Sequence, residues 1–198
     1  MANYRNDCCS PRPEHHKKEG FPVTILNCGN GTGVTLPVGN NLLNGASDAV
    51  AGSWGYPTLV VGTVTLDTRE LAHPDVKIDF SSLVNFRADS DLSGFTFRVV
   101  FQLSRSCDHG PRIPLANWLY QKEISVSLGG ITIPDIGLID IDLEFKDPFS
   151  FVWCDCHDCA GCCTYLVEII DIYTFNVESA SITNVGITAL ASGQPRHR

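Results

Sequence analysis

The chain has 198 residues and a mass of 21.6 kDa, and 43% of its residues are hydrophobic while 18% are charged. This length is enough for one well-packed domain. Residues 21–195 hold 8 basic and 19 acidic side chains, a formal charge of −11. Such an acidic body excludes a nucleic-acid groove or an anionic membrane surface as a partner, because both need a basic footprint. No apolar run approaches the roughly 18 residues of a transmembrane helix.

The first 20 residues are polar and aperiodic, with Pro11 and Pro13 among mixed charges. They predict a flexible N-terminal arm without a fold of its own, and they contain no apolar stretch of the kind a Sec signal peptide requires. A single domain is expected over residues 21–192. Residues 193–198 are expected to form a disordered tail.

Alternation of apolar and polar residues with a period of two dominates the rest of the chain. In Phe95–Leu103 the apolar side chains occupy every second position, which is typical of a half-buried antiparallel strand. The short run Ala46–Ala51 would fit one helical turn. The sequence therefore predicts an all-β, antiparallel two-sheet sandwich, a jelly roll. Its expected strands are 23–27, 34–38, 58–67, 76–80, 95–103, 118–128, 139–145, 149–154, 163–175 and 181–189.

Motifs that suggest chemistry have simpler structural interpretations. Cys28-Gly-Asn-Gly-Thr-Gly33 resembles a phosphate loop, but a strand-like segment follows it rather than a helix, which favours a turn or bulge at a sheet edge. Cys107 and His109 are two residues apart, which favours a turn over a catalytic dyad. The acidic row Asp140, Asp142 and Glu144 fits a solvated strand face better than a calcium site. No enzyme activity and no cofactor are expected.

Nine cysteines form an odd set, so they cannot all pair within one chain. Five of them fall in Cys154–Cys163, which is expected to be the tip of a hairpin, with Cys154 ending one strand and Cys163 starting the next. Intrachain disulfides are the favoured interpretation, because a cross-strand bond could close such a hairpin. The candidates are Cys154, Cys156, Cys159, Cys162 and Cys163. A zinc site remains open as an alternative, with the ligands Cys154, Cys156, Cys159, Cys162 and His157.

The sequence resembles a family of small β proteins of spore-forming Firmicutes that share a domain of unknown function. The segments that carry the resemblance span roughly residues 26–170 and, in chain order, are Cys28–Gly33 followed by Leu36-Pro37, Leu66-Asp-Thr68 with Pro74 and Lys77–Phe80, Cys107 followed by Trp118, and Cys154–Cys156 through Cys159 to Cys162-Cys-Thr-Tyr165. The last segment is the most specific. The resemblance implies no established activity.

A second similarity is architectural. Endospore appendage fibres are built from jelly-roll subunits with an N-terminal arm that carries a Cys-Cys pair, and this chain is similar in placing Cys8-Cys9 before a β domain. The similarity implies disulfides between subunits, with Cys8, Cys9, Cys28 and Cys107 as candidates. It also implies an extracellular or spore-surface location reached without a Sec signal peptide.

These observations predict a self-assembling structural subunit of an extracellular or spore-surface fibre or coat. Its expected partners are further copies of itself, through the arm, and other spore-surface proteins. A small zinc-binding β protein is the alternative. A carbohydrate-binding module comes third and would use Trp54, Tyr56 and Trp118.

Overall fold

The computed structural model describes residues 21–38, 58–90, 94–125, 141–156 and 161–196. The predictions for residues 1–20, for Ala46–Ala51 and for Trp54 and Tyr56 lie outside these residues. Within the described parts of the chain there are strands and turns but no helix, and so no helix that could cross a membrane.

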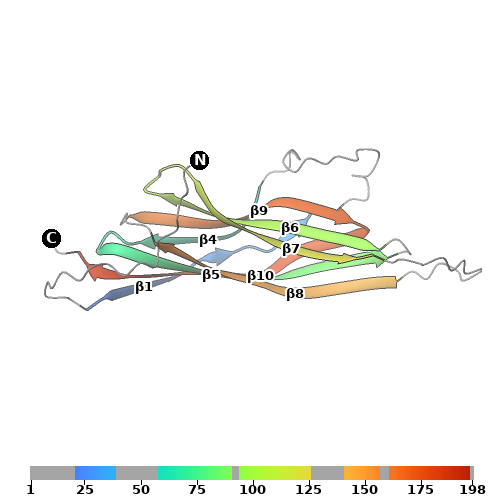
Figure 1. Ribbon diagram of the computed structural model, residues 1–198, viewed down its shortest axis with the longest axis horizontal. Helices are drawn as coiled ribbons and strands as arrows, with labels where there is room; N and C mark the ends of the chain where they lie inside the picture. Colours follow the sequence, from blue (N-terminus) through green and yellow to red (C-terminus); the bar gives the residue numbers. More distant parts are fainter. Residues whose placement is uncertain (1–20, 39–57, 91–93, 126–140, 157–160, 197–198) are drawn as a thin grey trace, which may run out of the picture.

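Ten strands make up the described structure (Figure 1). In chain order they are β1 (Val23–Cys28), β2 (Asn30–Gly31), β3 (Val34–Leu36), β4 (Leu59–Asp67), β5 (Leu71–Ser90), β6 (Phe95–Cys107), β7 (Ile113–Ile124), β8 (Ile141–Cys156), β9 (Cys162–Phe175) and β10 (Val177–Pro195).

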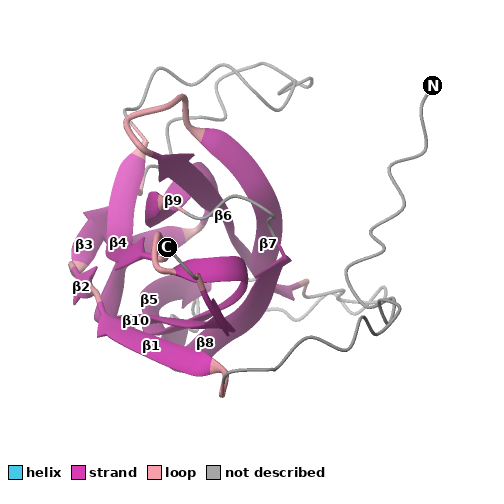
Figure 2. Ribbon diagram, turned by 90° about the vertical axis from the view of Figure 1, so that its left-hand side faces the viewer, coloured by secondary structure: helices cyan, strands magenta, loops and turns pink. Residues whose placement is uncertain are grey.

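The strands form two antiparallel sheets. Sheet A has the order β1-β10-β5-β8, with β3 also paired to β10, and sheet B has the order β2-β4-β9-β6-β7. Figure 2 looks along the length of the molecule and shows the sheets as two layers around a common core. The predicted all-β, two-sheet sandwich is confirmed.

Aromatic side chains from both sheets fill the core. The alternation predicted for Phe95–Leu103 is confirmed, since Phe97, Val99 and Phe101 on β6 are fully buried. The Phe97 ring stacks on Phe86 of sheet A with 4.5 Å between centroids. Burying each large apolar side chain contributes roughly 1.5–3 kcal/mol, so this face accounts for much of the attraction between the sheets.

Several strand boundaries differ from the sequence prediction; the strand expected at 76–80, for example, is the middle of β5, which runs over Leu71–Ser90. The strands expected at 139–145 and 149–154 are one strand, β8, which runs through Pro148. A sheet-edge strand tolerates this proline because one side of it needs no ladder N–H. At the other end, β10 continues to Pro195, with Gln194 opposite Ala72 of β5. Residues 193–195 therefore lie in a strand rather than in the expected tail.

The glycine segment after β1 carries the chain between the sheets. β1 belongs to sheet A, β2 to sheet B and β3 again to sheet A. The crossing brings backbones into close approach, because a Cβ on Gly29 would lie 2.2 Å from the carbonyl oxygen of Thr63. The segment is thus a crossover that contains the short edge strand β2 rather than the expected turn or bulge, it needs glycine for space at Gly29, and a strand rather than a helix follows it.

Candidate functional site

One disulfide joins two neighbouring strands of sheet B. Cys107 ends β6 and bonds Cys163 at the start of β9, and the two residues are directly opposite in the ladder with 4.0 Å between their Cα atoms. This corrects the expectation that Cys107 bonds a neighbouring subunit. Cys163 is in an intrachain disulfide as predicted, but its partner is 56 residues away rather than in its own cluster.

The expected hairpin between Cys154 and Cys163 is wrong, because the two strands belong to different sheets. Cys154 lies on β8 opposite Lys77 of sheet A, whereas Cys163 lies on β9 in sheet B. The chain therefore passes from one layer to the other over this segment. No β8–β9 ladder exists in which a cross-strand bond could form.

A tight turn after Cys107 supports the disulfide. Asp108 and His109 have positive φ angles of 47° and 62°, as both central residues of a type I′ hairpin turn must. The N–H of Gly110 closes the turn by donating to the carbonyl of Cys107 at 2.7 Å. His109 is exposed at this tip, where it contributes to the turn predicted from the sequence.

The same turn fixes the start of β9. The Asp108 carboxylate accepts a hydrogen bond from the N–H of Cys162 at 3.0 Å, and the N–H of Asp108 donates to the Cys162 carbonyl at 2.9 Å. The buried Thr68 hydroxyl donates to the carbonyl of Gly161 at 3.0 Å. A Cβ on Gly161 would lie 2.5 Å from the Asp108 carboxylate, so a larger residue there would displace this carboxylate from its hydrogen bond to Cys162.

A buried ion pair connects the two sheets beside this disulfide. Arg105 on β6 contacts Asp155 on β8 at 2.5 Å, and their side chains are only 7% and 11% exposed. The Tyr165 hydroxyl donates to the same carboxylate at 3.0 Å. Burial, with the nearby Asp155 charge, raises the pKa of Tyr165 well above its ordinary value of 10.0.

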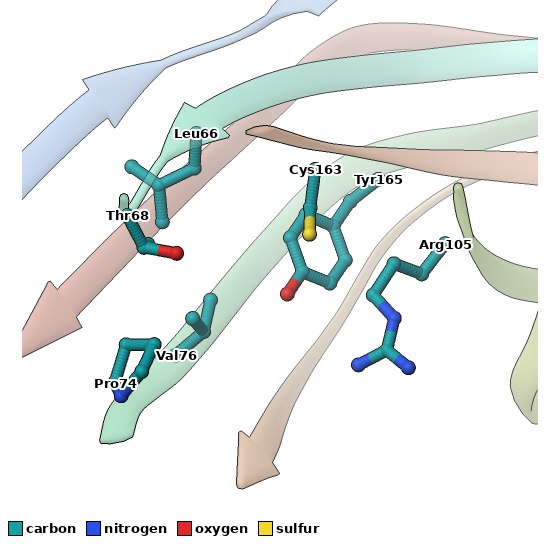
Figure 3. Close-up of a pocket in the computed structure, with 7 residues that line it drawn as sticks. All are labelled: Leu66, Thr68, Pro74, Val76, Arg105, Cys163 and Tyr165. Carbon is teal, nitrogen blue, oxygen red and sulfur yellow. The ribbon is translucent and has the colours of Figure 1, made fainter. Parts of the chain in front are cut away.

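Side chains from both sheets close over this network. Figure 3 shows Cys163, Tyr165 and Arg105 extending toward Val76 and Pro74 of β5. They border a cavity of about 10 Å³, which is room for a single water molecule at most. The arrangement fastens the layers together and has no space for a substrate.

A second polar contact joins the sheets where β7 and β8 lie side by side. Asp147 on β8 accepts hydrogen bonds from Lys122 at 2.6 Å and from Tyr120 at 2.7 Å. These bonds hold the pKa of Asp147 below its ordinary value, the Lys122 bond contributing most. The Lys122 ammonium also lies 4.4 Å from the centre of the Phe145 ring, a cation–π distance.

Aromatic side chains line the remainder of this side. Trp118 on β7 stacks on Phe151 of β8 with 3.7 Å between centroids, and Trp153 meets Trp118 edge-on. Trp118, expected as an exposed sugar-binding residue, is half-buried in this stack. The indole N–H of Trp153 is buried and has no hydrogen-bond partner among the described residues.

Three cysteines of the described chain are free thiols. Cys28 and Cys154 are exposed and Cys162 is half-buried. The remaining candidates lie outside what the structure describes, namely Cys8, Cys9, His157, Cys159 and the side chain of Cys156. No group of three His, Cys, Asp or Glu side chains within the described ranges is placed to hold a metal ion.

The acidic row on β8 is described only in part. Asp140 and the side chain of Asp142 are outside the described residues, whereas Glu144 is exposed and pairs with Lys146 at 2.7 Å. Glu144 is thus engaged with a neighbouring cation on a solvated strand face.

Comparison with known proteins places this geometry in a family. Residues 22–192, from just before β1 to near the end of β10, match the model described as Domain of unknown function (DUF4489). The chain belongs to the DUF4489 family. No curated protein matches this DUF4489 chain. The infectious bursal disease virus Gx strain structure is similar at 10% identity over 94% of this chain and 42% of that one, but its TM-score of 0.30 supports no argument.

Proposed function

We propose that this DUF4489 protein is a self-assembling structural subunit of an extracellular or spore-surface fibre or coat. Subunits would be joined through residues 1–20 and through disulfides between neighbours. The observation that carries the proposal is the placement of the free thiols: Cys28 and Cys154 are exposed on strands at opposite edges of sheet A, while Cys107 and Cys163 are bonded to each other inside the subunit.

Thiols at opposite edges suit a chain of subunits. A contact that joins one edge of a molecule to a different edge of the next copy is heterologous. It produces a filament when the rotation from one subunit to the next does not close a ring. A pair of equivalent surfaces would instead stop at a dimer. Arm cysteines that bond Cys28 on β1 or Cys154 on β8 of a neighbour would therefore favour extended assembly.

Ties between the strands would help the body of such a subunit to remain folded under load. The Cys107–Cys163 bond, the buried Arg105–Asp155 pair and the Lys122–Asp147 pair tie strands together within and between the sheets. Breaking a buried pair leaves a charge without compensation, which is strongly destabilising. Such ties suit a protein whose role is mechanical, and the cavity beside them has no room for a ligand.

The proposed location follows from cysteine chemistry. Disulfides persist in oxidising surroundings and are rare in reducing cytosol. A subunit made inside a cell and exposed when that cell lyses would meet oxidants only after its arm has reached a neighbour. Covalent closure would then follow assembly rather than precede it.

The test compares the full chain with the variant C8S/C9S, which keeps the arm but removes its two thiols. Both proteins are incubated under oxidising conditions and examined by non-reducing electrophoresis and electron microscopy. The proposal predicts reductant-sensitive polymers for the parent chain and none for C8S/C9S, with the same circular dichroism spectrum for both. Identical reductant-sensitive ladders from the two proteins would contradict it.

A further inference from the structure

One edge of sheet A is an unpaired strand of unusual length. β8 pairs with β5 along its whole length without a register shift, from Asp75 opposite Cys156 to Ser90 opposite Ile141. Its other side has no strand partner among the described residues. The neighbouring β7 of sheet B reaches β8 through side chains such as Tyr120 and Lys122, not through a ladder.

Pro148 reveals which backbone groups of β8 face the open side. Proline has no N–H, so in a paired strand its nitrogen must point away from the partner strand. Because the register with β5 is continuous, alternation places the N–H and C=O groups of Ser150, Val152 and Cys154 on the open side as well. No strand among the described residues pairs with these groups, so this edge can accept another strand.

The two halves of the open edge are not equally protected. Natural edge strands resist unwanted pairing with proline and charged side chains, and the first half of β8 has both in Pro148 and the exposed Glu144–Lys146 pair. The second half presents Ser150, Val152 and Cys154, without a charge on its outer face. Val152 is 56% exposed there.

The inner side of this half also has an unmet donor. The buried indole N–H of Trp153 has no partner among the described residues, and buried donors are normally hydrogen-bonded. A strand added beside β8 would bring backbone carbonyls and polar side chains to this side of the sandwich.

We propose that Phe149–Cys156 of β8 accepts residues 2–10 of a second copy as an added strand, and that Cys154 is the covalent acceptor for Cys8 or Cys9. The inference rests on the proposed function and names the acceptor. Ala2–Ser10 is a run of nine residues without proline, bounded by Pro11. Extended, it spans about 30 Å, which matches the roughly 26 Å of Phe149–Cys156.

The position of the arm's attachment favours a neighbour as the donor. The arm joins the body at Phe21 before β1, at the edge of sheet A opposite β8. The two edges are three strand spacings apart, about 14 Å, so a subunit's own arm reaches β8 only by crossing the face of its own sheet with residues 11–20. A neighbour whose β1 edge lies against the β8 edge delivers its arm directly.

The chemistry of the bond follows from strand geometry. Adjacent cysteines on a strand point to opposite faces, so one of Cys8 and Cys9 shares the outer face with Cys154. With residues 2–10 alongside Phe149–Cys156, Cys8 or Cys9 lies beside Cys154 when the added strand runs parallel to β8. Neighbouring strands are about 4.8 Å apart, within the Cα–Cα range for a disulfide. Each thiol loses a proton, and their two electrons reduce a low-molecular-weight disulfide to two thiols.

The test mixes unlabelled and ¹⁵N-labelled full-length chains before oxidation and maps cross-linked peptides by mass spectrometry without reduction. We expect a mixed-isotope disulfide between Cys8 or Cys9 and Cys154, which C154S removes and the matched variant C28S retains. A link from the arm to Cys28, or only same-isotope links to Cys154, would overturn the acceptor or the second copy respectively. In the first case a reductant-sensitive polymer would still support the proposed function, whereas the second case would also contradict joining of subunits through residues 1–20.

Backbone pairing is tested separately with S150P and its control S150A. Proline at position 150 removes an open-side N–H but no bond to β5, so S150P should fold with an unchanged circular dichroism spectrum. We expect it to assemble at least tenfold more slowly than the parent, whereas S150A assembles at the parent rate. A folded S150P that assembles at the parent rate would refute strand addition at this edge.

Discussion

Removing the Cys107–Cys163 disulfide should destabilise the subunit by about 4 kcal/mol. The bond joins residues 56 apart in sequence, and the chain-entropy model gives a loop of that size about 4 kcal/mol at 25 °C through restriction of the unfolded chain. The two residues remain opposite each other in the β6–β9 ladder. The variant C107A/C163A should therefore keep its fold while losing stability.

The assay is guanidinium unfolding followed by tryptophan fluorescence, in a C8S/C9S background that prevents links through the arm. The free energy of unfolding should fall by about 4 kcal/mol when Cys107 and Cys163 are replaced or when the parent is reduced. Adding reductant to C107A/C163A serves as the control and should change little. An unchanged midpoint for the parent after reduction would refute the reasoning.

Three further predictions use the same unfolding assay. Phe97→Ala empties a fully buried site and should lower the free energy of unfolding by about 3–5 kcal/mol. The control Leu119→Ala, at a 57% exposed site, should lower it by less than about 0.5 kcal/mol. Equal losses of stability would contradict the assigned core. Arg105→Met leaves the Asp155 carboxylate buried without its partner and should cost about 3–5 kcal/mol, so a neutral result would show that the pair does not join the sheets. Burial raises the pKa of Tyr165 in the folded state above 10.0, its ordinary value. The contribution of this hydroxyl to the free energy of unfolding is therefore complete below pH 10.0 and is lost as the pH rises above it. Tyr165→Phe should make stability fall less steeply at alkaline pH.

Alternation alone predicted the sandwich and much of its core. In Phe95–Leu103 every second side chain is buried, because a strand with one face against the core has an apolar residue at every second position. Neighbouring side chains on a strand point to opposite faces, and accordingly Cys163 is bonded while Cys162 is a free thiol. Strand ends were less predictable, since β10 ends three residues beyond the predicted domain.

The pairing of distant strands could not be predicted from one sequence. Cys107 meets Cys163 only because β6 lies beside β9 in sheet B, and local patterns contain no information on that order. The buried Arg105–Asp155 pair did leave a signal. Arg105 comes two residues after Leu103 on β6 and so faces the core with it. Asp155 likewise comes two residues after Trp153 on β8. Opposite charges on two core faces are a reason to expect such a pair.

Other contacts left no signal. Thr68, Asp108 and Gly161 come together through backbone and side-chain hydrogen bonds between three separate strand ends. The type of each residue is common in turns, and nothing in their spacing shows that they meet. Only the sheet topology brings them to the disulfide.

The central claim is that this chain forms a covalent homopolymer through its arm. The most direct measurement is the mass distribution of the oxidised full-length protein on denaturing gels, with and without reductant. The account predicts a ladder at multiples of 21.6 kDa that collapses to the monomer on reduction. A single 21.6 kDa species under both conditions, from protein oxidised at concentrations where subunits meet, would contradict it.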